Sequence, residues 1–154
     1  MSDLDRIDRA LLRLLQSDGR TPLVKLAAEV SLSETPCWRR IKRLEQAGYI
    51  QGYKARVDRR KAGYNLVVFV YLAVSSHTAE ATRDFERRIL ACPRVLMFHN
   101  VSGQHDFLLQ VVAQDLHDYS RFVEDELRAI PYITDIHSVI SLRDIGGDID
   151  LPIP

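Results

Sequence analysis

Two short amphipathic helix patterns, separated by only a few residues, constrain the first third of this 154-residue chain. The first has its apolar residues between Leu23 and Val30, and the preceding pair Thr21–Pro22 predicts the N-cap and the first helical residue. The second follows Ser33, a capping residue, and extends to about Ala47, where Gly48 can end it in a left-handed conformation. A short helix, a tight turn and a longer basic helix form the helix-turn-helix pattern, whose second helix enters the major groove of DNA.

A third amphipathic helix is predicted before this pair, from Leu4 to about Leu15, with Gly19 placed to end it. The charge distribution separates this part of the chain from the rest. Residues 1–63 carry 14 Lys and Arg against 8 Asp and Glu, whereas residues 64–154 carry 7 against 13. We therefore expect two modules with different partners, and the basic module, residues 1–63, is the nucleic-acid candidate.

The second helix of the pair has one apolar and one basic face. Cys37, Ile41 and Leu44 fall in one sector and predict the core face, although Cys37 could instead be a thiol sensor. The basic run could be an ordinary solvated face, but the preceding turn favours insertion into a DNA groove. Trp38 lies on a flank and could pack on the first helix or touch the DNA backbone. The predicted DNA-contacting residues are Ser33, Thr35, Pro36, Trp38, Arg39, Arg40, Lys42, Arg43 and, further along, Lys54.

The segment after this helix predicts a strand. Residues 49–57 are rich in β-formers, and Lys54 alternates with apolar neighbours as in the wing of a winged helix, where it would contact phosphate. Residues 58–63 then predict a capped turn and a hinge between the modules.

The second module, residues 64–154, reads as strand, helix, strand, strand, helix, strand. This order is typical of the ferredoxin-like βαββαβ sandwich, so the chain is predicted to be an α+β protein. The first strand is apolar on both faces, so we expect helices on one face and a second subunit on the other. The expected ranges are Leu66–Val74, Thr78–Ala91, Val95–Ser102, Asp106–Ala113, Leu116–Ile130 and Ile133–Leu142.

Three stretches carry a family resemblance that periodicity alone does not supply. The run LDRIDRALLRLL at Leu4–Leu15, the stretch Leu26–Ile50 and the loop VSGQHDFLL at Val101–Leu109 resemble the Lrp/AsnC family of bacterial and archaeal regulators. The segment TPCWRRIKRLE at Thr35–Glu45 resembles the subgroup whose recognition helix opens with Thr-Pro-Cys-Trp. Nearly the whole chain is covered by this resemblance.

The resemblance implies a winged helix-turn-helix followed by an effector-sensing domain, with dimers built through the sheets and often a ring of four dimers. It also implies a transcription regulator that binds double-stranded DNA and responds to an amino acid held between dimers. The implied effector loop contains Ser102, Gly103, Gln104, His105 and Asp106. Gly103 can expose backbone N–H groups to a carboxylate and Asp106 can pair with an ammonium group, but both residues also suit any tight hairpin.

The sequence contains no motif that is typical of an enzyme, a metal site, a disulfide-rich protein or a membrane protein. No catalytic motif is present, so no enzyme, metal or cofactor is predicted. Cys37 and Cys92 are too few for a disulfide framework, and the sequence contains no membrane-spanning or secretory run, which favours a cytoplasmic protein. Two alternatives remain: a sirohaem-decarboxylase-like enzyme, although residues 49–63 contain no histidine, and an amino-acid sensor that does not bind DNA.

Overall fold

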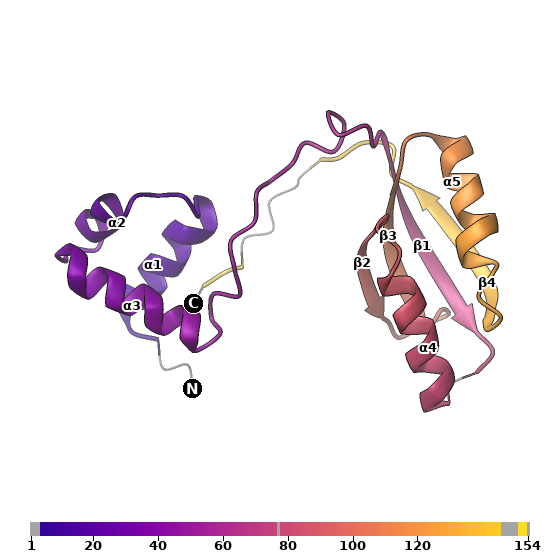
Figure 1. The fold of residues 1–154 in the computed structure, drawn as a ribbon, viewed down its shortest axis with the longest axis horizontal. Helices are drawn as coiled ribbons and strands as arrows, with labels where there is room; N and C mark the ends of the chain where they lie inside the picture. The colour runs from indigo at the N-terminus through magenta and orange to yellow at the C-terminus, as the bar shows by residue number, and fades with distance from the viewer. Residues whose placement is uncertain (1–3, 77, 146–150, 154) are drawn as a thin grey trace. The chain divides into compact units, whose positions relative to one another are not determined.

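The computed structural model describes residues 4–76, 78–145 and 151–153 (Figure 1). These residues form two compact units, one containing residues up to Arg56 together with the tail 151–153, and the other containing residues 57–145. Each unit has its own hydrophobic core. The tail is predicted from the sequence to belong to the second module, whereas the contacts of Leu151 and Ile153 with the first helix place it in the first unit.

The described residues of the N-terminal unit form three helices: α1 (Arg6–Ser17), α2 (Leu23–Glu29) and α3 (Glu34–Gln46). Asp5 caps α1 in a capping box, because its carboxylate accepts from the backbone N–H of Asp8 and the Asp8 carboxylate accepts from that of Asp5. Gly48 follows α3 with φ +77°, the left-handed conformation predicted for it. The three helices enclose a core of Leu11, Leu12, Leu26, Ala27, Cys37, Ile41 and Leu44.

The turn between α2 and α3 holds a conformation that the sequence did not predict. Ser31 has φ +55°, which is uncommon for a residue with a side chain, and the turn is closed by backbone bonds to α2. At the start of α2, Pro22 is the N-cap itself and not the first helical residue, so the expected capping role of Thr21 is wrong. The Thr21 hydroxyl instead donates to the Asp18 carbonyl and closes the preceding turn.

The predicted wing strand at residues 49–57 is wrong in this structure. Residues 51–57 are exposed and form no strand. A strand needs a partner for its backbone hydrogen bonds, and the described residues of the N-terminal unit are otherwise helices, turns and the short tail. The alternation of charged and apolar residues around Lys54 therefore does not correspond to a paired strand in the structure.

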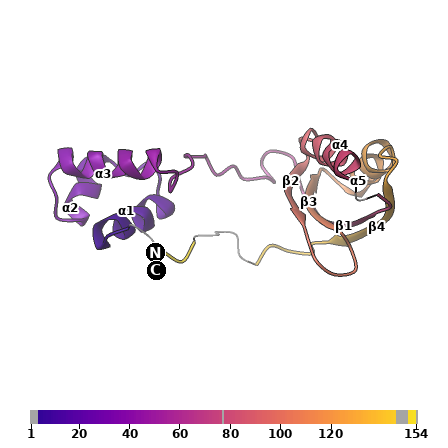
Figure 2. The ribbon, with the colours of Figure 1, turned by 90° about the horizontal axis from the view of Figure 1, so that it is seen from below.

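The C-terminal unit is a four-stranded antiparallel sheet in the order β2-β3-β1-β4, as the ferredoxin-like prediction requires. Figure 2 shows α4 and α5 on the same face of this sheet. The second helix region changes character, because α5 ends at Phe122 and a π-helical turn, η1, continues from it. The elements are β1 (Leu66–Val74), α4 (Ala79–Leu90), β2 (Val95–Asn100), β3 (Phe107–Ala113), α5 (Leu116–Phe122), η1 (Val123–Leu127) and β4 (Ile133–Ile140).

The two apolar faces of strand β1 have different surroundings. Val68, Val70 and Leu72 are fully buried in the core beneath the helices, where Phe85 of α4 meets the rings of β2 and β3. Phe69, Tyr71 and Ala73 alternate with these residues, lie on the other face and are half-buried. Among the residues that the structure describes, no helix covers that second face (Figure 2), and its contact with another subunit stays a prediction.

Candidate nucleic-acid interface and effector loop

Helix α3 presents its basic side to solvent. Cys37, Ile41 and Leu44 are buried, which confirms the predicted core face. Burial raises the pKa of the Cys37 thiol, which favours its role as core filler over that of a reactive thiol. Trp38 is half-exposed at 50%. The other predicted contact residues on the outer side are exposed or, for Pro36, half-buried: Thr35, Pro36, Arg39, Lys42 and Arg43.

A fully buried carboxylate connects α3 to α1. Asp8 has no solvent exposure, and its two oxygens accept from two arginines of α3. Arg40 donates from Nη1 to Oδ1 over 2.9 Å, and Arg43 donates from Nη2 to Oδ2 over 2.5 Å. The same Arg40 nitrogen also reaches Asp5 Oδ2 at 2.5 Å. Two helices that are separated in sequence are thus joined by one charge network.

The electrostatics of this network favour the charged forms. The backbone N–H of Asp8, followed by the Arg40 guanidinium, lowers the pKa of the Asp5 carboxyl below its ordinary value. Asp5 and then Asp8 raise the pKa of Arg40 in turn. Because both oxygens of Asp8 are occupied by helix α3, the network aligns the recognition helix on α1.

The structure therefore divides the cations of α3 into two groups. Arg40 and Arg43 bind Asp8, a role that was not predicted from the sequence, and their contact with DNA stays a prediction. The signal was present, because Asp8 lies in the apolar stripe of α1, four residues after Leu4 and three residues before Leu11. Arg39 is exposed and has no hydrogen bond or ion pair among the described residues.

Lys42 belongs to a second, exposed network at the end of α3. It donates to Glu45 over 2.6 Å, and the Tyr53 hydroxyl donates to the same carboxylate over 3.1 Å. Lys42, followed by Tyr53, lowers the pKa of Glu45. Tyr53 also covers Gly19, where an added Cβ would meet its ring at 3.0 Å, so the chain after α3 folds back over the end of α1.

The remaining predicted DNA contacts lie beside α3. Ser33 is the N-cap residue of α3, but its side chain makes no capping hydrogen bond and is exposed. Lys54 is exposed in the extended segment that follows Tyr53. The structure thus leaves both side chains accessible.

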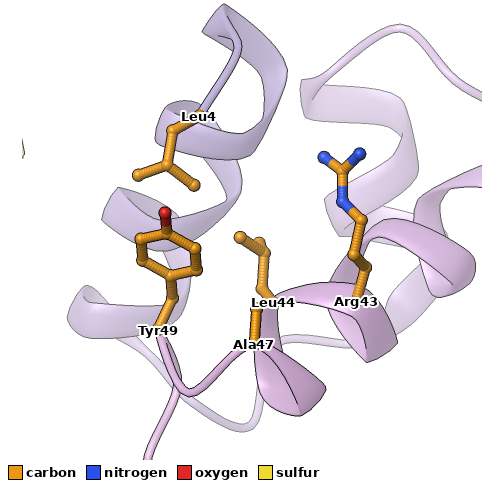
Figure 3. Close-up of a pocket in the computed structure, with 5 residues that line it drawn as sticks. All are labelled: Leu4, Arg43, Leu44, Ala47 and Tyr49. Atoms are coloured by element: carbon orange, nitrogen blue, oxygen red, sulfur yellow. The ribbon is translucent and has the colours of Figure 1, made fainter. Parts of the chain in front are cut away.

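A hollow of about 490 Å³ lies between the start of α1 and the last turns of α3 (Figure 3). The side chains of Leu4 and Tyr49 point toward each other across it, with Leu44 and Ala47 along its floor and Arg43 on the other side. Arg43 is its charged lining residue and is already paired with Asp8, so the hollow presents no free charge to a ligand.

In the C-terminal unit, the loop between β2 and β3 brings the five predicted effector residues together. Ser102, Gly103 and Gln104 are exposed, and Gly103 has φ +138°, a conformation that side chains rarely adopt. Asp106 is half-buried and accepts from the backbone N–H of Val74 at 2.8 Å, at the end of β1. Asp106 therefore joins the loop to β1, whether or not it also meets a ligand.

His105 points back onto the sheet face that carries no helix. Its ring stacks on His137 at a centroid distance of 5.9 Å, lies 5.6 Å from Tyr71, and its Nε2 is 3.3 Å from an Asp135 oxygen. The structure thus separates His105 from the exposed tip of the loop. No group of three or more His, Cys, Asp or Glu side chains within residues 4–76, 78–145 and 151–153 is arranged to hold a metal ion. No helix in these ranges is long and apolar enough to cross a membrane.

Comparison with known proteins assigns both units. Residues 4–45 match the AsnC-type helix-turn-helix domain, and residues 67–148 match the Lrp/AsnC ligand binding domain. The Bkd operon transcriptional regulator of Pseudomonas aeruginosa is 39% identical over 145 residues, covering 94% of this chain and 95% of that protein. The leucine-responsive regulatory protein of Rhizobium meliloti is 38% identical over 143 residues, covering 93% of this chain and 92% of that protein.

A solved structure is similar along nearly its whole length. The crystal structure of a transcriptional regulator from Neisseria meningitidis in complex with L-methionine has a TM-score of 0.93 and 33% identity. The match covers 97% of this chain and 96% of that one. Sequence and fold thus agree across both units.

Proposed function

Because the chain belongs to the Lrp/AsnC family of transcriptional regulators, we propose that it binds an operator through α3 and adjusts that binding to an amino acid held by its C-terminal unit. The observation that carries the DNA part is the exposed outer side of α3 in a helix-turn-helix unit with a buried inner side. Thr35, Arg39 and Lys42 face outward for direct contact, whereas Arg40 and Arg43 align the helix through Asp8.

The proposed division of labour follows the modules. The N-terminal unit binds double-stranded DNA, and the C-terminal unit assembles the oligomer and binds the effector. The sheet face without helices supports dimers, because it presents half-buried apolar side chains on β1 and β3. Four dimers would complete an octamer, and each dimer would place two recognition helices in successive major grooves, roughly 34 Å apart. We place the protein in the cytoplasm, where its DNA would be.

The effector is proposed to be an amino acid at the loop Ser102–Asp106. Support comes from the L-methionine complex of the Neisseria meningitidis regulator and from the exposed, glycine-containing tip of the loop. No cofactor is part of the proposal. The curated relatives are transcriptional regulators and the protein is not an enzyme, and the comparisons give no support to the sirohaem-decarboxylase alternative.

Replacement of Arg39 by alanine is expected to weaken operator binding by about 1 to 3 kcal/mol, because an exposed arginine on the groove side can bridge a guanine edge. The probe is a duplex selected from random sequence with this protein, titrated by fluorescence anisotropy. Arg83→Ala removes an exposed arginine of α4 that has no partner among the described residues, and it serves as the charge-matched control. Equal affinities of Arg39→Ala and Arg83→Ala would refute the role of Arg39, and failure of the wild type to select any duplex would favour a sensor that does not bind DNA.

Two substitutions at Asp106 separate its structural role from ligand binding. Asp106→Asn keeps an acceptor for the Val74 N–H but removes the charge, so we expect an unchanged melting temperature and at least roughly tenfold weaker amino-acid binding. Asp106→Ala should lose both. A thermal-shift screen of the wild type against the twenty amino acids identifies the ligand, and calorimetry then compares the variants. Full ligand affinity in Asp106→Asn would mean that the carboxylate serves only the loop.

A further inference from the structure

The described C-terminal tail, residues 151–153, lies along α1 and is held mainly by its backbone. Gln16 donates from Nε2 to the Leu151 carbonyl over 3.1 Å and accepts from the Leu151 N–H over 2.9 Å. Arg13 donates from Nη2 to the Ile153 carbonyl over 2.8 Å. The Ile153 side chain packs against the core of the N-terminal unit, whereas the Leu151 side chain is 65% exposed.

These contacts follow one stripe of α1. Arg9, Arg13 and Gln16 are spaced by four and three residues and therefore share a helix face. The tail advances from Gln16 to Arg13, toward the start of the helix. Next in that direction is Arg9, whose Nε is buried and has no hydrogen-bond partner among the described residues. The stripe thus offers donors to the carbonyl groups of an extended peptide and retains one unused donor.

Composition suits the tail to this mode of binding. Pro152 has a restricted φ and no N–H, so the tail loses little conformational freedom on docking and leaves no unpaired donor at that position. The two-point contact of Gln16 with one residue sets the register, and Ile153 supplies apolar contact.

From this arrangement, and on the basis of the proposed function, we propose that the stripe Arg9–Arg13–Gln16 is a docking site for the chain's own C-terminal tail, and that docking strengthens operator binding. The tail continues the chain that contains the effector-binding unit, so docking gives the DNA-binding unit a second covalent connection to it, in addition to the segment that precedes β1. A second connection reduces the conformational freedom that DNA binding must otherwise remove.

The docked helix is also the one that aligns α3. Asp8, which binds Arg40 and Arg43, lies on α1 two turns before Gln16. Tail contacts that immobilise α1 therefore act on the same element that holds the recognition helix. Release of the tail is expected to weaken operator binding by about three- to tenfold without altering the base contacts themselves.

The test uses the 154-residue chain, three single-residue variants of it and a chain ending at Asp150. Arg13→Ala removes the contact to Ile153 but leaves the acceptor of the Leu151 N–H in place, so faster hydrogen exchange at Leu151 would report release of the whole tail. Gln16→Ala removes both contacts to Leu151. Arg6→Ala is the matched control, because Arg6 is an exposed arginine on the same helix and has no partner in the part of the chain that the structure describes. Exchange is followed by mass spectrometry, and operator affinity by anisotropy on the selected duplex.

We expect protection at Leu151 in the wild type and in Arg6→Ala, at least tenfold faster exchange in Arg13→Ala, and three- to tenfold weaker DNA binding in Arg13→Ala, Gln16→Ala and the truncated chain. Equal exchange in the wild type and in Arg13→Ala would overturn docking. Released tails with unchanged operator affinity would overturn its role in DNA binding. Neither result resembles failure of the proposed function, in which the wild type itself selects no duplex.

Discussion

The substitution Asp8→Ala is expected to lower the free energy of unfolding of the N-terminal unit by about 2 to 3 kcal/mol. Removing the buried carboxylate leaves Arg40 and Arg43 without their shared partner and breaks the capping box of α1. The value lies below that for a wholly buried pair because the Arg43 side chain is 59% exposed and can return to water. Urea unfolding followed by Trp38 fluorescence measures it, since Trp38 is the chain's one tryptophan and lies on α3.

Glu29→Ala is the control for this experiment, because Glu29 is an exposed carboxylate of α2 without a partner in the described structure. It should change the same free energy by less than about 0.5 kcal/mol. Operator affinity should also fall in Asp8→Ala, because α3 loses its alignment although no DNA-facing side chain is changed. An Asp8→Ala protein as stable as Glu29→Ala would contradict the assigned network.

Phe85→Ala is expected to destabilise the C-terminal unit by about 3 to 5 kcal/mol, the largest effect of any substitution considered. Phe85 is 1% exposed and its ring contacts Phe98 and Phe107, with centroids 5.8 and 4.6 Å away. Truncation would leave a cavity between α4 and the sheet. The far-ultraviolet circular dichroism signal reports the unfolding of both the C-terminal and the N-terminal unit.

The same variant tests whether the two cores unfold separately. The cores share no residues, so the Trp38 transition should keep its midpoint in Phe85→Ala while an earlier transition appears in the circular dichroism. Ala55→Ser, a small exposed change outside both cores, should leave both signals unaltered. Coincident transitions that move together in Phe85→Ala would show one cooperative unit.

Much of the fold followed from local patterns. The apolar run that predicts a strand at Leu66–Val74 coincides with β1, and the helix predicted from Glu34 ends one residue early, at Gln46. These elements are legible because their burial repeats along the chain with a regular period. The order of strands and helices was then sufficient to indicate the four-stranded topology.

The errors occur where distant residues decide the outcome. The expected wing at residues 49–57 has the right composition but finds no backbone partner, and composition cannot supply one. Nor does periodicity reveal the π-helical turn after Phe122. Such features depend on tertiary packing, which a local pattern does not encode.

The candidate site shows the same division. The core and solvent sides of α3 were predicted correctly, because the spacing of its apolar residues determines them. The partners of its arginines were not, since the pairing of Arg40 and Arg43 depends on an aspartate more than thirty residues earlier. Asp106 likewise has a backbone partner on β1 that its position in a hairpin loop did not indicate.

The charge network at Asp8 has a consequence for how regulators of this type can diverge. A duplicated copy that changes Arg40 or Arg43 loses part of its fold together with any change in operator preference. The fold depends less on Thr35, Arg39 and Lys42. Among the described residues, Lys42 forms one surface ion pair, with Glu45, and none of the three binds a buried carboxylate. We therefore expect operator preference to change most readily through these outward positions, and we expect Arg40 and Arg43 to be retained because they hold the recognition helix on α1.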